Sequence, residues 1–166
     1  MDNAEKNRFV KRQITAALLA ALETKELKDI SVSQIAADAG VSRISFYRNF
    51  QNKEGVLRAY MAQLMNGRIN GPKPDKTYPE PDILGEIFAC LVEYKDFFLL
   101  LRKRNLLYLL KDIIMEILGP KPESPNFSAY TSAFLAYGLY GWIEEWFARG
   151  MKESAWEMKE LLKIGI

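Results

Sequence analysis

The stretch SVSQIAADAGVSRISFYRNFQNKEGVL, residues 31–57, decides the fold of this chain of 166 residues. Ser31 followed three residues later by Gln34 is typical of the capped start of a helix. Gly40 marks the end of that helix, because glycine adopts a left-handed backbone without strain. Val41 then supplies an apolar side chain next to the turn. The pattern predicts one short helix followed by a tight turn.

A second short helix follows that turn. Ser42 predicts its N-cap, and Phe46 and Phe50 are spaced to anchor it on one face. Helix, tight turn and helix are the layout of a helix-turn-helix, whose second helix enters the major groove of DNA. The opposite face is rich in hydrogen-bond donors, which suit base edges and phosphates. These donors are Arg43, Ser45, Tyr47, Arg48 and Asn49.

Asn52 predicts the cap of the next helix and places Lys53 near its start. A cation at a helix N-terminus is disfavoured by the helix dipole, whereas an anion there is favoured. A DNA phosphate at this position would relieve the conflict. The sequence therefore predicts that Lys53 contacts phosphate.

The order of these residues resembles the N-terminal signature of the TetR family of transcriptional regulators. The resemblance extends over about residues 11–64, and many ordered positions agree rather than one short motif. The matching groups are Ser31-Val32-Ser33-Gln34-Ile35-Ala36, Ala39-Gly40-Val41-Ser42, Ser45-Phe46-Tyr47 with Phe50, and Lys53-Glu54 with Leu57.

The resemblance implies a role for each residue near the turn. Residues expected at base edges are Ser33, Arg43, Ile44 and Ser45. Residues expected at phosphates are Ser42, Tyr47, Asn49 and Lys53, and Arg48 suits either partner. The implied partner is double-stranded DNA carrying a palindromic operator, read by a homodimer whose recognition helices lie about 34–36 Å apart or slightly wider.

Composition excludes several kinds of chemistry. The chain has no histidine and a single cysteine, Cys90. Catalysis by Ser-His-Asp or Cys-His is therefore excluded, as are an internal disulfide and the usual zinc sites. Glu144-Glu145 is the one acidic pair of the long helix expected near the C-terminus, and adjacent positions point to different faces. We expect no enzyme, no catalytic residue, no metal and no cofactor.

The distribution of charge and hydropathy fits a DNA-binding protein. The net charge is +2, but the first 68 residues carry a basic surplus and the remainder a slight acidic one. The chain opens with the polar stretch MDNAEKNRFVKRQ, which predicts no signal peptide. Apolar runs stay far below the roughly 20 residues of a membrane span. The sequence predicts a soluble, cytoplasmic protein without membrane contact.

Helical periodicity without alternating strand patterns predicts an all-α fold. A three-helix head with a helix-turn-helix is expected to join a helical C-terminal domain through a fourth helix. That fourth helix is expected over residues 52–66. We expect a DNA-binding domain at residues 1–66, a Pro/Gly-rich linker at 67–81, and a domain for dimerisation and effector binding at 82–166.

One long helix is expected over residues 125–149, where small residues alternate with large aromatic ones. Glycine inside a helix is unfavourable unless another element packs closely against it. The resemblance to a subgroup of the family with a short C-terminal domain implies a dimer interface here, although an ordinary intrachain core remains the alternative. The expected interface residues are Ala133, Tyr137, Tyr140, Gly141 and Trp142.

The resemblance also implies a small-molecule effector inside the C-terminal domain. An aromatic stripe at helical spacing more often forms plain core, but the candidate lining residues are Phe88, Leu91, Tyr94, Phe98, Tyr108, Phe134 and Tyr137. The run Arg102-Lys103-Arg104 could hold an anion or form a solvated turn. The predicted function is a transcriptional repressor released by an effector. The alternative is a DNA binder controlled by a protein partner, or an activator without a small ligand.

Overall fold

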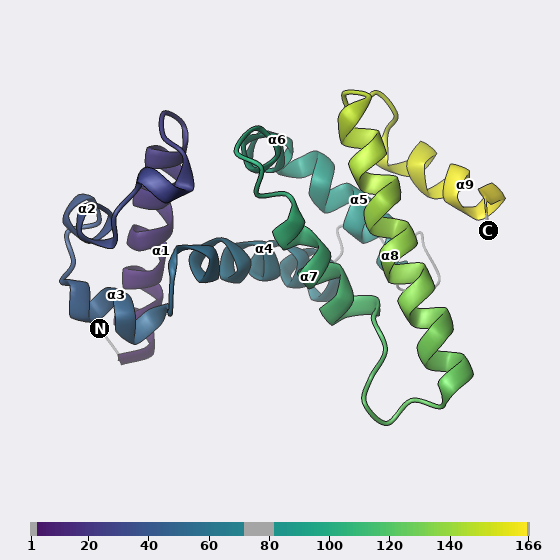
Figure 1. Ribbon diagram of the computed structural model, residues 1–166, viewed down its shortest axis with the longest axis horizontal. Coiled ribbons are helices and arrows are strands. Elements are labelled where there is room, and N and C mark those ends of the chain that lie inside the picture. The colour runs from purple at the N-terminus through teal and green to yellow at the C-terminus, as the bar shows by residue number, and fades with distance from the viewer. Residues whose placement is uncertain (1–2, 72–81, 166) are drawn as a thin grey trace.

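The computed structural model describes residues 3–71 and 82–165, and this part of the chain is entirely helical apart from turns and loops (Figure 1). The helices near the N-terminus are α1 (Asn3–Leu22), the 3-10 helix η1 (Leu27–Asp29), α2 (Val32–Asp38), α3 (Arg43–Asn49) and α4 (Lys53–Asn70). Those that follow are α5 (Ile83–Glu93), α6 (Lys95–Lys103), α7 (Tyr108–Leu118), α8 (Asn126–Ala148) and α9 (Ala155–Gly165). The all-α prediction is confirmed for the described residues.

Figure 1 shows two lobes joined by α4. We call α1, η1, α2 and α3 the head, and α5 to α9 the body. In the head, α1 packs against α2 and α3, and α4 lies against α1 before it leaves toward the body. In the body, α7 packs along α8, α5 packs against α9, and α4 contacts both α5 and α7. A single helix therefore contacts both lobes and connects them.

The cores are apolar and closely packed. Ile14 and Leu18 of α1 are fully buried in the head together with Phe46. In the body, the ring of Phe88 meets that of Trp146 edge-on at 5.7 Å between centroids, an arrangement that suits aromatic pairs. None of the polar or charged residues in the described part of the chain is buried. Burial of apolar side chains therefore holds each lobe together.

Helix boundaries differ from the expectations in three places. The fourth helix was expected to end at Asn66, but α4 continues through Gly67 to Asn70. The sequence also predicts a helix over residues 105–118, but α7 begins only at Tyr108, because Asn105 has a left-handed backbone with φ +56° and ends α6. The long helix was expected from Pro125, which is instead the N-cap of α8. Most of the expected linker, residues 72–81, lies outside the described residues.

Candidate nucleic-acid interface

The turn before α3 forms as the sequence predicts. Ser31 caps α2, since its Oγ accepts a hydrogen bond from the Gln34 N–H at 3.1 Å. Gly40 has φ +65°, the left-handed conformation that ends α2. The Val41 N–H then donates to the Ala36 carbonyl at 2.9 Å, which closes the turn. These local bonds fix the direction in which α3 leaves α2.

Phe46 and Phe50 hold α3 against the rest of the head. Both side chains are buried, and their ring centroids lie 6.1 Å apart. The other side of α3 faces water, where Ile44 is 73% exposed and Tyr47 is 53% exposed. Arg43 and Arg48 are exposed as well. The structure thus brings two guanidinium groups, a phenol and an aliphatic side chain onto the open side of one short helix.

The remaining polar residues predicted at this site are partly occupied by bonds within the helix. The Ser42 Oγ accepts from the Ser45 N–H and lies 3.1 Å from the Ser45 Oγ. The Asn49 amide donates to the Ser45 carbonyl at 2.8 Å, so its NH₂ group stabilises α3 itself. Ser33 is exposed in the first turn of α2. Arg43, Tyr47 and Arg48 are therefore freer to bind a partner than Ser42, Ser45 and Asn49.

Lys53 has a partner that sequence reasoning did not find. Its half-buried ammonium donates to the Ile30 carbonyl at 2.7 Å and to the Leu27 carbonyl. Both carbonyls belong to the segment around η1, more than 20 residues earlier in the chain. The conflict with the helix dipole is thus relieved inside the protein, without a phosphate. Asn52 caps α4 as predicted, through its Oδ1 and the Gly55 N–H at 2.7 Å.

Arg104 connects the body to the head. Its guanidinium donates to the Leu22 and Glu23 carbonyls at 2.6 and 2.7 Å, and pairs with Glu26 at 2.9 Å. The side chain is only 12% exposed. Satisfying the last carbonyls of a helix with a cation is favourable, and here the helix is α1. Arg104 is thus neither a free anion site nor part of a solvated turn, the two readings considered from the sequence.

A second connection involves Arg58 of α4. Its guanidinium pairs with Asp112 and, at 2.5 Å, with Glu116, both on α7. All three side chains are more than a third exposed, so water weakens this pair more than the contacts of Arg104. Together the two arginines fix how the head and α4 sit relative to the body.

The residues proposed as an effector pocket do not share one cavity. Phe88, Leu91 and Phe98 are fully buried in the packed core of the body. Tyr108, Phe134 and Tyr137 are exposed. Tyr94 is half-buried at the junction of α5 and α6. Of these seven residues only Phe134 lines an apolar pocket of about 450 Å³, whose lining also includes Leu84, Leu118, Leu139, Trp142 and Leu162.

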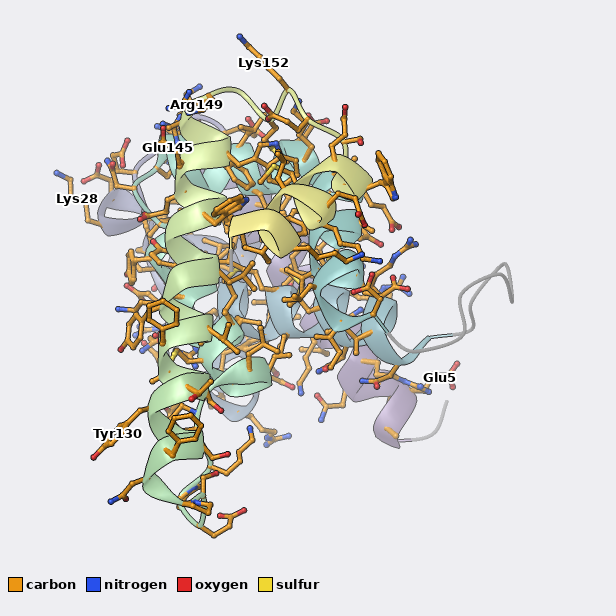
Figure 2. All side chains as sticks on the ribbon, turned by 90° about the vertical axis from the view of Figure 1, so that its right-hand side faces the viewer. Glu5, Lys28, Tyr130, Glu145, Arg149 and Lys152 are labelled. Atoms are coloured by element: carbon orange, nitrogen blue, oxygen red, sulfur yellow. The ribbon has the colours of Figure 1, made fainter. Side chains whose placement is uncertain are left out.

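The outer face of α8 is unusually apolar for a surface. Viewed from the right-hand side of Figure 1, α8 runs along the near face, and Tyr130 points away from it (Figure 2). Phe127, Tyr130 and Phe134 are 83%, 70% and 72% exposed. Tyr137, 55% exposed, continues the same face one turn later. Of the predicted interface residues, Gly141 is exposed on this face, whereas Ala133, Tyr140 and Trp142 are half-buried.

Sequence reasoning thus missed Phe127 and Tyr130, although their helical spacing with Phe134 was visible. The Tyr140 hydroxyl donates to the Glu144 carboxylate at 2.6 Å, and burial together with this bond raises the pKa of Tyr140. The phenol therefore stays protonated in any physiological buffer.

None of the helices in residues 3–71 and 82–165 is long and apolar enough to cross a membrane.

Comparison with known proteins gives matches to both lobes. Residues 14–60 match the family model of bacterial regulatory proteins of the tetR family, and residues 81–166 match that of a transcriptional regulator C-terminal region. One relative is the HTH-type transcriptional regulator EthR of Mycolicibacterium smegmatis. It is 42% identical over 60 residues, which is 34% of this chain and 28% of the length of that relative.

Proposed function

The chain belongs to the TetR family of DNA-binding transcriptional regulators, and from that premise we propose that it acts in the cytoplasm as a homodimeric repressor of a palindromic operator. The observation that carries the proposal is the open face of α3, where Arg43, Tyr47 and Arg48 are exposed around a buried Phe46 anchor. The part of the chain up to the end of α4 binds DNA, and residues 82–166 dimerise.

Base readout rests on Arg43 in the first turn of α3. The N-terminal residues of a recognition helix are those that reach base edges in helix-turn-helix proteins. A guanidinium reads guanine through two hydrogen bonds, and an exposed aliphatic side chain such as Ile44 suits a thymine methyl group. Ser33 and Ser45 complete the base contacts. Arg48, near the end of the helix, binds either bases or backbone.

Phosphate contacts rest on Tyr47, Ser42 and Asn49. The exposed Tyr47 hydroxyl has the reach and the donor for a backbone oxygen, and such contacts set the register of the protein on the duplex. We now assign Lys53 a positioning role, because its ammonium already donates to the Ile30 and Leu27 carbonyls. One N–H of that ammonium is left over for a phosphate.

The homodimer is proposed from the apolar face of α8. An exposed row of Phe127, Tyr130, Phe134 and Tyr137 is costly in water and marks a protein interface. A Cβ added at Gly141 would meet no atom of the protomer within 4 Å. Gly141→Leu therefore has room in an isolated protomer. A leucine there obstructs only a second copy packed against α8.

The dimer proposal is tested with Gly141→Leu by light scattering, with operator binding measured on the same samples. We expect a shift to monomer and a fall in operator affinity, because two linked heads bind far better than one. Retained dimer mass with full affinity would place the interface elsewhere.

The effector is proposed to bind the apolar pocket of about 450 Å³ between α5, α7, α8 and α9. A pocket of this size, lined mainly by aliphatic and aromatic side chains, suits a small apolar molecule. Such a molecule would release DNA only if it prefers a protomer geometry with a different head spacing. Trp142 lines the pocket, so its fluorescence would report binding.

The alternative, a DNA binder controlled by a protein partner or acting as an activator, draws on the exposed aromatic face of α8 and on Trp156 of α9. One experiment separates the functions. Fragments of the source genome retained by the protein are sequenced, and transcription of the adjacent genes is compared with and without the protein. Repression predicts higher transcription in its absence, and activation predicts lower transcription.

A further inference from the structure

A cleft of about 510 Å³ opens in the head where α4 leaves α1. Its apolar surface includes Leu19 of α1, Tyr60 of α4, and Phe50, which directly follows α3. Leu19 and Tyr60 are half-buried, and Phe50 is the anchor of the recognition helix described above. The cleft therefore reaches the side chain that holds α3 in place.

Three cations stand along one edge of this cleft. Arg8, Lys11 and Arg12 lie on successive turns of α1 and are exposed. Within residues 3–71 and 82–165, none of these three side chains forms an ion pair with a carboxylate. By contrast, Arg58 and Arg68 of α4 and Arg104, which follows α6, are paired with carboxylates. The positive charge on this edge is thus uncompensated within the described chain.

An apolar cleft beside uncompensated cations complements a molecule with an apolar chain and an anionic end. We propose that this cleft binds a small amphipathic anion, a carboxylate or phosphate monoester on a single apolar chain. The anionic end pairs with Arg8, Lys11 and Arg12, and the chain lies against Leu19 and Tyr60. DNA phosphates would also bind these cations, but they make no use of the apolar cleft.

This site is separate from the body pocket proposed for the effector. A ligand here lies between α1 and α4, whose contact sets the orientation of the head on the connecting helix. It also neutralises cations of the DNA-binding lobe, which weakens electrostatic attraction to the duplex. The consequence for DNA rests on the proposed function, whereas the binding itself does not.

The test is isothermal titration calorimetry of the full chain without DNA, using decanoate below its micelle concentration. Decanol supplies the same chain without charge, and inorganic phosphate supplies charge without a chain. We expect decanoate to bind and to outcompete both controls by tenfold or more. Equal binding of decanol, or of inorganic phosphate, would overturn the proposal.

Variants locate the site. Lys11→Gln combined with Arg12→Gln should weaken decanoate at least tenfold, and Ala59→Leu should do so by filling the cleft while keeping the cations. Lys152→Gln, at an exposed lysine on the connection between α8 and α9 in the body, is the control (Figure 2). Circular dichroism confirms that each variant folds.

Two outcomes would contradict the assignment. Decanoate binding that survives both head variants but is lost on Leu139→Trp would place the ligand in the body pocket. A double variant that loses DNA affinity while decanoate never bound the parent protein would make the cations plain phosphate contacts. Because the calorimetry contains no DNA, failure of the repressor proposal cannot change the result for decanoate binding in either case.

Discussion

Helices α3 and α8 each leave large side chains in water, but the two open faces differ in chemistry. On α3 the exposed groups Arg43, Tyr47 and Arg48 carry donors at their ends and surround one aliphatic side chain, that of Ile44. On α8 they are aromatic rings, with Phe134 at 72% exposure. Donors fit phosphates and base edges, whereas bare rings fit another apolar surface. An uncovered helix face thus indicates the kind of partner that covers it.

The two faces also differ in what supports them. Helix α3 has seven residues and depends on the Ser42 cap and the buried Phe46. Helix α8 has 23 residues and buries Ile143 and Phe147 along its inner side. The α3 face is therefore sensitive to changes in its local supports. The α8 face should tolerate surface substitutions until a second copy has to pack against it.

The largest effect is expected from a substitution on the exposed face of α8. Phe134→Asp places a charge among exposed rings, so the protomer should fold but the dimer should dissociate. Operator affinity should fall about 100-fold or more, since the advantage of two linked heads is lost. Mass is measured by light scattering and affinity by fluorescence anisotropy. Val92→Asp, at an exposed position of α5, is the control and should leave both unchanged.

The next effect tests the support of the α3 face. Lys53→Met removes the ammonium that donates to the Ile30 and Leu27 carbonyls and leaves both without that partner. The free energy of unfolding should fall by about 1.5–3 kcal/mol, the range for hydrogen bonds to charged groups. Urea denaturation measures it, with the exposed Lys28→Met as control. Lys53 would instead be a phosphate contact if stability were unchanged and the slope of log operator affinity against log salt concentration fell by one per head.

A smaller effect is expected when the proposed base contact of α3 is removed. Arg43→Ala should cost about 1–3 kcal/mol in operator binding and relax the preference at one base pair per half-site. Binding is compared across operators substituted at each position in turn. Equal losses on operator and scrambled DNA would reduce Arg43 to a backbone contact.

The smallest effect concerns α9, which borders the α8 face. Glu157 accepts bonds from the Ser154 N–H and hydroxyl, and the backbone bond is the main reason its pKa lies below the ordinary value. A carboxyl group whose pKa is lower in the folded state than in the unfolded state stabilises the fold at pH values above the unfolded pKa. This contribution is lost as the pH falls through the folded pKa. The stability difference between the parent and Glu157→Gln should vanish on acidification. Fluorescence of the neighbouring Trp156 reports unfolding. A stability difference that stayed constant with pH would contradict the capping role of Glu157.

The predictable parts of the molecule depend on neighbours in the chain. Ser31, Gly40 and Ser42 act on residues within a few positions, so their spacing alone indicated both caps and the turn. The capping box of α9 is local in the same way, since it joins Ser154 to Glu157 three positions later. Periodicity likewise located the long helix α8.

The parts that escaped prediction depend on distant segments. Arg104 contacts the Leu22 carbonyl, 82 residues away in the chain, and no local pattern marks that pair. Lys53 likewise meets carbonyls from another segment of the head. The aromatic stripe gave candidate effector residues, but tertiary packing decided that Phe88 is core and Phe134 is surface. Periodicity predicts that a helix has two faces and does not say which partner covers each.

The central claim, that α3 reads DNA as one half of a dimer held by α8, is tested most directly by selecting bound duplexes from a randomised pool. We expect enrichment of an inverted repeat with half-sites about one helical turn apart or slightly wider. Arg43→Ala should lose enrichment at one symmetric pair of positions. No enriched sequence with the parent protein would contradict base reading by α3, and an enriched half-site without its repeat would contradict the dimer.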